Sequence, residues 1–160
     1  MNGWMTTALI VALVAAVVVK RLRGEPLDAR ELLGAPVILT GVGAWSVVQA
    51  SGHLTAADFG WVAAGSVLGL ALGAVRGRTV EVFECDGVAW HRYTGRTFLA
   101  ALGTFALMAA FGYAAVRAGM HEEARPTTLS IGVSYLGEAL AVAVRGMGTG
   151  LPFAAQGARR

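Results

Sequence analysis

The sequence predicts an all-α membrane protein, a bundle of five transmembrane helices with a small β-hairpin between helices three and four. Three observations lead to this prediction. Hydrophobic residues make up 56% of the 160 residues and charged residues only 14%, a balance expected where lipid is the main solvent. Five apolar stretches each approach the ~20 residues that cross a bilayer as a helix. An alternating segment with a central Asp-Gly pair occupies residues 79–94. The chain is therefore expected to form one membrane domain, 1–160.

The five predicted spans are separated by charges and turn residues. They cover about residues 4–19, 32–51, 56–75, 97–117 and 128–147. The first span is the shortest and is expected to cross with little tilt. It is not expected to be a cleaved signal peptide, because no basic residue precedes its apolar run and KRLRG follows it.

The distribution of cations predicts that the N-terminus lies outside and the C-terminus inside. In this orientation 11 of the 13 Lys and Arg residues are cytoplasmic, and only Arg117 and Arg125 are external, as the positive-inside rule requires. An odd number of spans connects these two ends, which independently favours five. The net charge of +3 is then attributed to loops beside anionic lipid head groups. The expected partner is a bilayer and not a nucleic acid.

Several turn residues predict where the helices begin. Pro36 is expected in the first turn of the second span, where proline is tolerated. Thr55 and Asp58 have the spacing of a capping pair at the start of the third span. Thr127 or Thr128 is expected to cap the fifth span.

The third span contains a glycine at every fourth position. Gly65, Gly69 and Gly73 fall on one helix face and would let another backbone approach closely. The pattern predicts a helix interface. Packing within the chain is favoured, and a homodimer through the same glycines is the alternative.

The segment VEVFECDGVAWHRY, residues 80–93, predicts a β-hairpin. A type I′ turn at Asp86-Gly87 would pair Cys85 with Val88, Phe83 with Trp90 and Glu81 with Arg92. An isolated hairpin is only marginally stable, so this one is expected to rest on helix ends, the membrane surface or another protein. A rigid connector is favoured over a docking site for a membrane-protein partner at residues 79–94.

The layout resembles the CcdC-like family of small bacterial membrane proteins. The resemblance covers nearly the whole chain: five spans, a basic first inner loop leading to a proline-started second helix (DARELLGAP), and an Asp-Gly ribbon between spans three and four (RTVEVFECDGVAWHRYTGR). It implies a multi-pass protein of the bacterial cytoplasmic membrane. Some family members are associated with cytochrome c maturation. This chain has a single cysteine, Cys85, and no haem-attachment or dithiol motif, and it has Ala35-Pro36 where the family tends to have two prolines.

Glu138 is the principal candidate for chemistry. It falls near the middle of the fifth span, where a carboxylate is costly and normally faces the bundle interior or a wet cavity. Ser134 and Tyr135 precede it by one helical turn, so the catalytic candidates are Glu138, Tyr135 and Ser134. Hydroxyls at similar predicted depth could complete a pocket: Thr40, Ser66 and Thr104. The alternative is a neutral carboxylic acid that only bonds two helices together.

No metal or cofactor site is expected. His53 and His121 fall in external loops and His91 in the cytoplasmic hairpin, and none has the helical spacing of a metal-binding motif. The sequence also lacks a Gly-x-Ser-x-Gly elbow and a Gly-rich phosphate loop.

Three classes of function remain. A non-enzymatic accessory or assembly factor is favoured, because no catalytic constellation is recognised. The second class is an oligomeric transporter or channel subunit that uses Glu138 as a proton or cation site. The third is a membrane enzyme acting on a lipid or isoprenoid, with Glu138 as general acid. A cavity at Glu138 would favour the second or third class, and close packing around it would favour the first.

Overall fold

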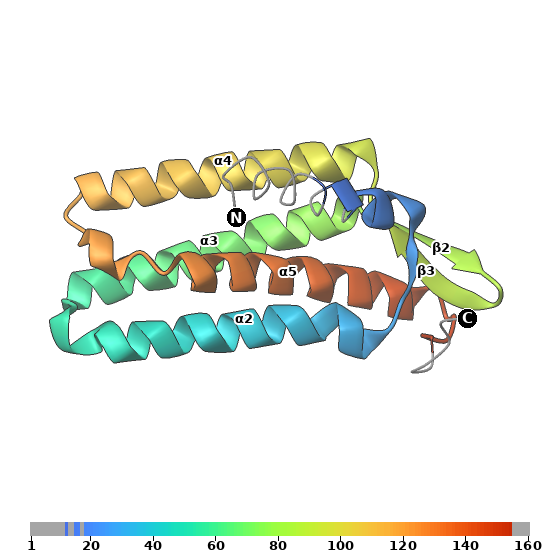
Figure 1. Cartoon of the computed structure of the whole chain (residues 1–160), viewed down its shortest axis with the longest axis horizontal. Coiled ribbons are helices and arrows are strands. Elements are labelled where there is room, and N and C mark those ends of the chain that lie inside the picture. Colours follow the sequence, from blue (N-terminus) through green and yellow to red (C-terminus); the bar gives the residue numbers. More distant parts are fainter. Residues whose placement is uncertain (1–11, 13–14, 17, 155–160) are drawn as a thin grey trace.

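The computed structural model describes residue 12 and residues 15–16 and 18–154 (Figure 1). Within this part of the chain, four helices are long and apolar enough to cross a membrane. They are α2 (Ala29–Ala50), α3 (Ala56–Thr79), α4 (Gly95–Arg117) and α5 (Thr127–Gly148). The first predicted span, 4–19, lies largely outside the described residues.

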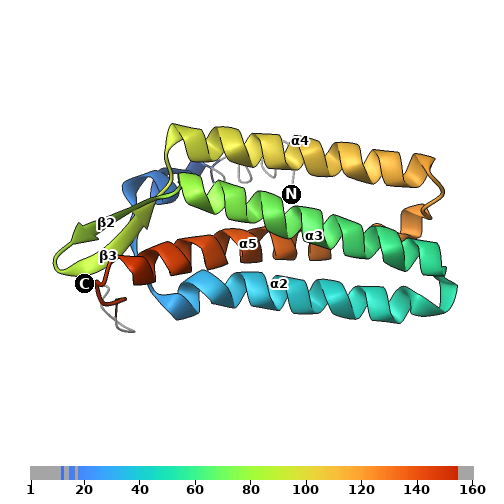
Figure 2. The same cartoon turned by 180° about the vertical axis from the view of Figure 1, so that it is seen from behind.

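Helix α5 forms the centre of the bundle. It packs between α2 and α3, and α4 packs on the side of α3, an arrangement visible from both sides of the molecule (Figures 1 and 2). Half of the most apolar window of α5 is buried, against 11% of the corresponding windows of α2 and α4. A polar side chain on the inner face of α5 is therefore enclosed by protein.

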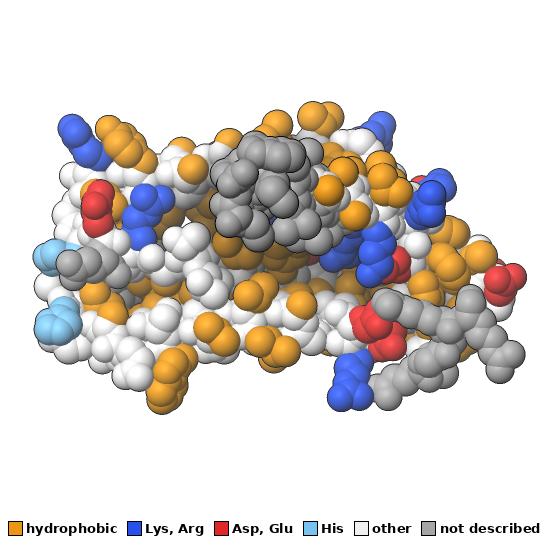
Figure 3. Space-filling view, viewed as in Figure 1, with side chains coloured by type: hydrophobic (Ala, Val, Ile, Leu, Met, Phe, Trp, Pro, Cys, Tyr) orange, Lys and Arg blue, Asp and Glu red, His pale blue; other side chains and the backbone are white. Residues whose placement is uncertain are grey.

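The outer faces of the bundle are apolar. Large hydrophobic side chains lie exposed on α2 and α4, including Ile38, Trp45 and Leu99, and hydrophobic atoms are spread along the face seen in Figure 3. Charged side chains in that view gather towards the two ends. Such a surface suits a hydrocarbon environment, in which apolar side chains need no cover.

Glycines set the close approach of α3 and α5. A Cβ atom added at Gly73 would lie 1.9 Å from the carbonyl oxygen of Ser134, and one added at Gly137 would lie 2.2 Å from the carbonyl oxygen of Leu70. Both distances are far below van der Waals contact. The two backbones therefore touch at these positions, and only glycine fits.

The other two glycines of the predicted groove have different neighbours. A Cβ at Gly65 would lie 3.0 Å from the ring of Phe111 on α4, and one at Gly69 would lie 3.6 Å from the Met108 methyl group. The glycine face thus divides between α4 and α5 of the same chain. Association of two copies through Gly65, Gly69 and Gly73 stays a prediction.

The helix starts agree only in part with the sequence prediction. The capping box of Thr55 and Asp58 is confirmed. Pro36 is the eighth residue of α2 and not a first-turn residue, because Asp28 caps the helix earlier. The predicted threonine caps of α5 are wrong, since Pro126 occupies the N-cap position and the threonines that follow are already helical.

The predicted hairpin is present with the predicted register. Strand β2 (Glu81–Cys85) pairs antiparallel with β3 (Val88–Arg92), and positive φ angles at Asp86 (52°) and Gly87 (74°) are those a type I′ turn needs. A third strand that was not predicted, β1 (Glu25–Pro26), pairs with the other edge of β3. The hairpin is thus one part of a three-stranded sheet in the order β1-β3-β2.

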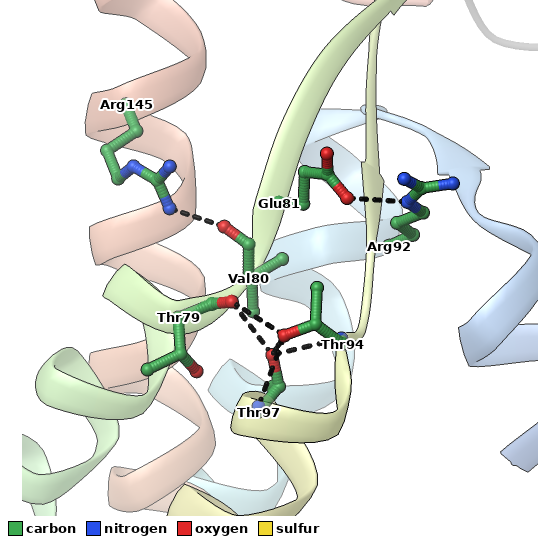
Figure 4. A network of polar contacts seen from close by, with 7 residues as sticks. All are labelled: Thr79, Val80, Glu81, Arg92, Thr94, Thr97 and Arg145. Carbon is green, nitrogen blue, oxygen red and sulfur yellow. Dashed lines mark hydrogen bonds and ion pairs between the residues drawn. The ribbon is translucent and has the colours of Figure 1, made fainter.

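The sheet rests on the helix ends. The carbonyl oxygen of Thr79, the last residue of α3, accepts hydrogen bonds from the hydroxyls of Thr97 (2.9 Å) and Thr94 (3.3 Å) at the start of α4. The guanidinium of Arg145 on α5 donates to the carbonyl oxygen of Val80 (Figure 4). The threonine bonds join the start of α4 to the end of α3, and the Arg145 bond joins α5 to Val80, the first residue of the hairpin. The hairpin is thus supported by helix ends.

Candidate functional site

Glu138 lies in a buried cluster where α3, α5 and the sheet meet. The residue is only 6% exposed. Arg76 of α3 donates through Nε to one carboxylate oxygen, and the Tyr93 hydroxyl, from the residue just after β3, donates to the other. Both oxygens therefore have protein partners, supplied by two different segments of the chain.

Local structure explains why these three side chains meet. Gly73 and Gly77 bring the last turns of α3 against the backbone of α5 at the level of Glu138. Arg76 is in the last turn of α3, where a cation also interacts favourably with the helix dipole. Tyr93 is carried to the same place by β3, because the sheet is fixed to the helix ends.

Aromatic rings and a second arginine surround the ion pair. The Arg76 guanidinium lies 4.9 Å from the centre of the Tyr135 ring, and the Arg21 guanidinium lies 5.1 Å from the centre of the Tyr93 ring. Such contacts contribute about 0.5–1 kcal/mol at an exposed cation and about 2 kcal/mol at a desolvated one. The predicted candidate Tyr135 is thus brought to the cluster as a partner of Arg76.

Two titratable groups on the sheet side, Tyr93 and His91, are held in their neutral forms. Burial, and then the negative charge of Glu138, raise the pKa of Tyr93, so its phenol remains a hydrogen-bond donor. Burial, and then the positive charge of Arg21, lower the pKa of His91. His91 is 7% exposed, and its Nδ1 atom has no hydrogen-bond partner among the described residues.

The remaining predicted residues are placed differently. The hydroxyl of Ser134 is buried and without a partner among the described residues, as is that of Thr40. The hydroxyls of Ser66 and Thr104 donate to carbonyl oxygens of their own helices. The predicted pocket of Thr40, Ser66 and Thr104 around Glu138 is therefore not formed by hydrogen bonds to its carboxylate.

Sequence reasoning missed Arg76 and Tyr93. The charge count places Arg76 among the cytoplasmic cations, although a glycine on each side of it, Gly73 and Gly77, marks a close helix contact. Tyr93 carried a weaker signal, since the predicted register places it opposite Val80, directly after α3. Either residue can be recognised as a partner of Glu138 only when the third and fifth helices are known to be neighbours.

The arrangement favours a fixed ion pair over proton exchange. Arg76 is 2% exposed, and removing one member of a buried pair costs about 3–5 kcal/mol because the other charge is left uncompensated. A cavity lies nearby, but the described residues that line it include Ser134 and not Glu138. Glu138 thus joins helices and sheet.

The histidines lie at opposite ends of the described structure. His121 contacts the capping residue Asp58 through Nδ1 at 3.0 Å, whereas His91 lies in the sheet. The described residues contain no group of three or more His, Cys, Asp or Glu side chains that could hold a metal ion.

Known proteins offer no guide to this cluster. No family model, curated protein or solved structure matches the chain. The function is therefore inferred from the closed geometry around Glu138.

Proposed function

We propose that this chain is a non-enzymatic accessory or assembly factor of the bacterial cytoplasmic membrane, with five spans, an external N-terminus and a cytoplasmic C-terminus. The observation that carries the proposal is the engagement of both Glu138 carboxylate oxygens by Arg76 and Tyr93. A transport or catalytic acid needs access to a substrate or to water, and this carboxylate is enclosed.

The ion pair has a role in this proposal that does not require chemistry. It joins α3 to α5, and the hydrogen bond from Tyr93 to Glu138 attaches the sheet to this pair, so the hairpin is presented as a rigid surface at one end of the bundle. Phe83 and Trp90 form a half-buried aromatic pair on that sheet with ring centres 6.3 Å apart, and Glu81 pairs with Arg92. A membrane-protein partner that docks here would meet a preformed surface, which lowers the entropic cost of binding.

The charge count and the resemblance to CcdC-like proteins support the rest of the proposal. Both favour five spans and a cytoplasmic hairpin, and the span additional to α2, α3, α4 and α5 would come from residues 4–19. The sheet would then face the cytoplasm.

The test is to remove the ion pair without leaving a buried charge. The double variant Arg76→Met with Glu138→Leu replaces both charges by unbranched or branched apolar side chains, a change that is often neutral or stabilising. It is expected to fold and to complement deletion of the gene. The matched single variants, Arg76→Met and Glu138→Leu, are expected to lose stability, because each leaves one charge buried and unpaired.

Two measurements on the double variant separate the classes of function. Thermal unfolding in detergent shows whether it folds, and growth of a deletion strain shows whether it works. A double variant as stable as the wild type that fails to complement would overturn the proposal, because an ionisable Glu138 would then be required. Proton flux in liposomes that depends on the wild-type protein would overturn it in favour of transport.

A further inference from the structure

A cavity of about 240 Å³ lies among α3, α4 and α5. It is larger than the ~150 Å³ apolar cavity that is known to accept benzene in another protein. It exists because α4 packs on α3 and scarcely touches α5. Its lining is mainly apolar, with Trp61 from α3, Phe105, Met108 and Phe111 from α4, and Ile131 from α5.

The cavity reaches the outer surface of the bundle on the side of α4. Phe105 lines it and is 51% exposed, and Ala109 lines it and is also exposed. A hydrocarbon chain in the bilayer can therefore enter between helices without crossing polar protein.

Water is a poor occupant of this space. An ordered buried water needs about two to four polar partners. The polar lining groups Arg125, Thr127 and Ser130 lie at or just before the start of α5. Beyond them, among the described lining residues, Ser134 offers a buried hydroxyl without a hydrogen bond, whereas the hydroxyl of Thr104 already donates to Ala100, so water lacks partners in the apolar part of the cavity. Hydrocarbon needs no such partners and would fill the apolar lining.

One cation lies at the end of the cavity away from the sheet. Arg125 lines the cavity just before α5 begins, and its guanidinium lies against Gly112 of α4, where a Cβ would be 2.7 Å from Nη2. The side chain is exposed, and no ion pair to a described carboxylate is formed. Ser134 lies seven residues beyond the start of α5, about 10 Å further along the helix axis.

We propose that this cavity binds one alkyl chain of an amphiphile whose anionic head, a carboxylate or phosphate, is held by Arg125. The guanidinium can form charge-assisted, bidentate hydrogen bonds with either group. The chain then runs between α3, α4 and α5 towards Ser134. Both a free fatty acid and an anionic membrane lipid supply this chemistry, so the experiment distinguishes them.

The measurement uses the fluorescence of Trp61, which lines the cavity. In the full chain, the other three tryptophans, Trp4, Trp45 and Trp90, are replaced by Phe. This single-tryptophan protein in neutral detergent is titrated with dibromostearic acid, whose bromines quench a nearby indole. Saturable quenching is expected with the acid, and the methyl ester of the same acid, which has no charge, is expected to bind at least tenfold more weakly.

Two matched pairs of variants locate the site. Arg125→Gln should weaken binding of the acid about tenfold or more, because charge-assisted hydrogen bonds to the anionic head are lost, and should leave the ester unchanged. Arg117→Gln, on an exposed arginine that does not line the cavity, should change neither. Ala109→Phe fills the cavity and should abolish saturable quenching, whereas Ala110→Phe, on the exposed neighbouring residue, should not.

The source of the ligand follows from a second titration. Brominated phosphatidylglycerol in nanodiscs of phosphatidylcholine should quench in the same Arg125-dependent way if the occupant is a bilayer lipid, and only the free acid should do so if it is a fatty acid. Either result supports the proposal. Quenching that is unsaturable, or equal in Ala109→Phe and Ala110→Phe variants of unchanged thermal stability, would overturn it. A change in oligomeric state in Ala109→Phe without loss of quenching would also overturn it, since a second copy would then cover the cavity.

Discussion

Replacing Gly73 with Ala tests the contact on which the Glu138 cluster depends. The new Cβ would lie 1.9 Å from the carbonyl oxygen of Ser134, and real Cβ contacts essentially never fall below 3.0 Å. The two helices must therefore separate by about 1.1 Å, and the atom in the way is rigid backbone. Overpacking of this kind costs about 1–3 kcal/mol. The same shift would lengthen the contact between Arg76 and Glu138.

The assay is thermal unfolding in detergent, with Gly60→Ala as the matched control. Gly60 lies in the same helix, and no atom lies within 4 Å of its added Cβ, so alanine there removes only the flexibility of glycine. The unfolding temperature of Gly73→Ala is expected to fall by about 2–12 °C for a chain of this size. Equal unfolding temperatures for the two variants would show that α3 and α5 do not touch at Gly73, and the reasoning would fail.

Three further predictions concern the sheet and the ion pair. Cys85 should react with a membrane-impermeant maleimide only after the cells are permeabilised, because the proposed orientation places the hairpin inside; labelling in intact cells would refute that orientation. The pKa of His91 is lowered from 6.5 by burial, so below about pH 6.5 the unfolded chain binds a proton more readily than the folded one. The unfolding temperature should therefore be constant with respect to His91 above this pH and fall as the pH decreases below it; a His91→Gln variant with the same pH dependence would contradict this assignment. Arg76→Gln should destabilise by about 3–5 kcal/mol by leaving Glu138 unpaired, whereas Tyr93→Phe should cost about 1 kcal/mol; equal losses in chemical denaturation would count against a charged pair.

The hairpin could be predicted to the residue because its information is local. Alternation with a period of two and the Asp86-Gly87 turn specify both the faces and the register, and all three predicted pairs on one face are present. Strand β1 could not be found in the same way. Two residues, one of them Pro26, carry no period, and they become a strand only because β3 offers a free edge.

The surroundings of Glu138 could not be predicted from the sequence. The depth of each side chain in the membrane is estimated from the centre of its own span, which says nothing about how neighbouring helices are aligned. Glu138 is central in α5 but lies beside Gly77, within three residues of the end of α3. The two helices are staggered, and the stagger is set by backbone contacts such as that of Gly73 with Ser134. Hydrophobic periodicity indicates which face of a helix is apolar, but not how far the helix is shifted along the axis of its neighbour. The sequence therefore predicts Arg76 as a charge in a cytoplasmic loop and not as a partner of Glu138.

The hydrogen bonds at one end of the sheet set the order in which this part of the chain can fold during synthesis. Leu27 donates to the carbonyl oxygen of Ala89, the amide of Ala89 donates to Pro152, and Ala154 donates back to Leu27. Leu27 therefore has no partner at Ala89 until more than sixty further residues have been added. The hydrogen bonds at this end of the sheet are complete only after residue 154 has left the ribosome. Strands β1 and β2 precede β3 in the chain and can pair with it as soon as it is made. The amide of Ala89 and the carbonyl oxygen of Leu27 stay without these partners until residues 152 and 154 follow, and unpaired strand groups of this kind can pair with another chain.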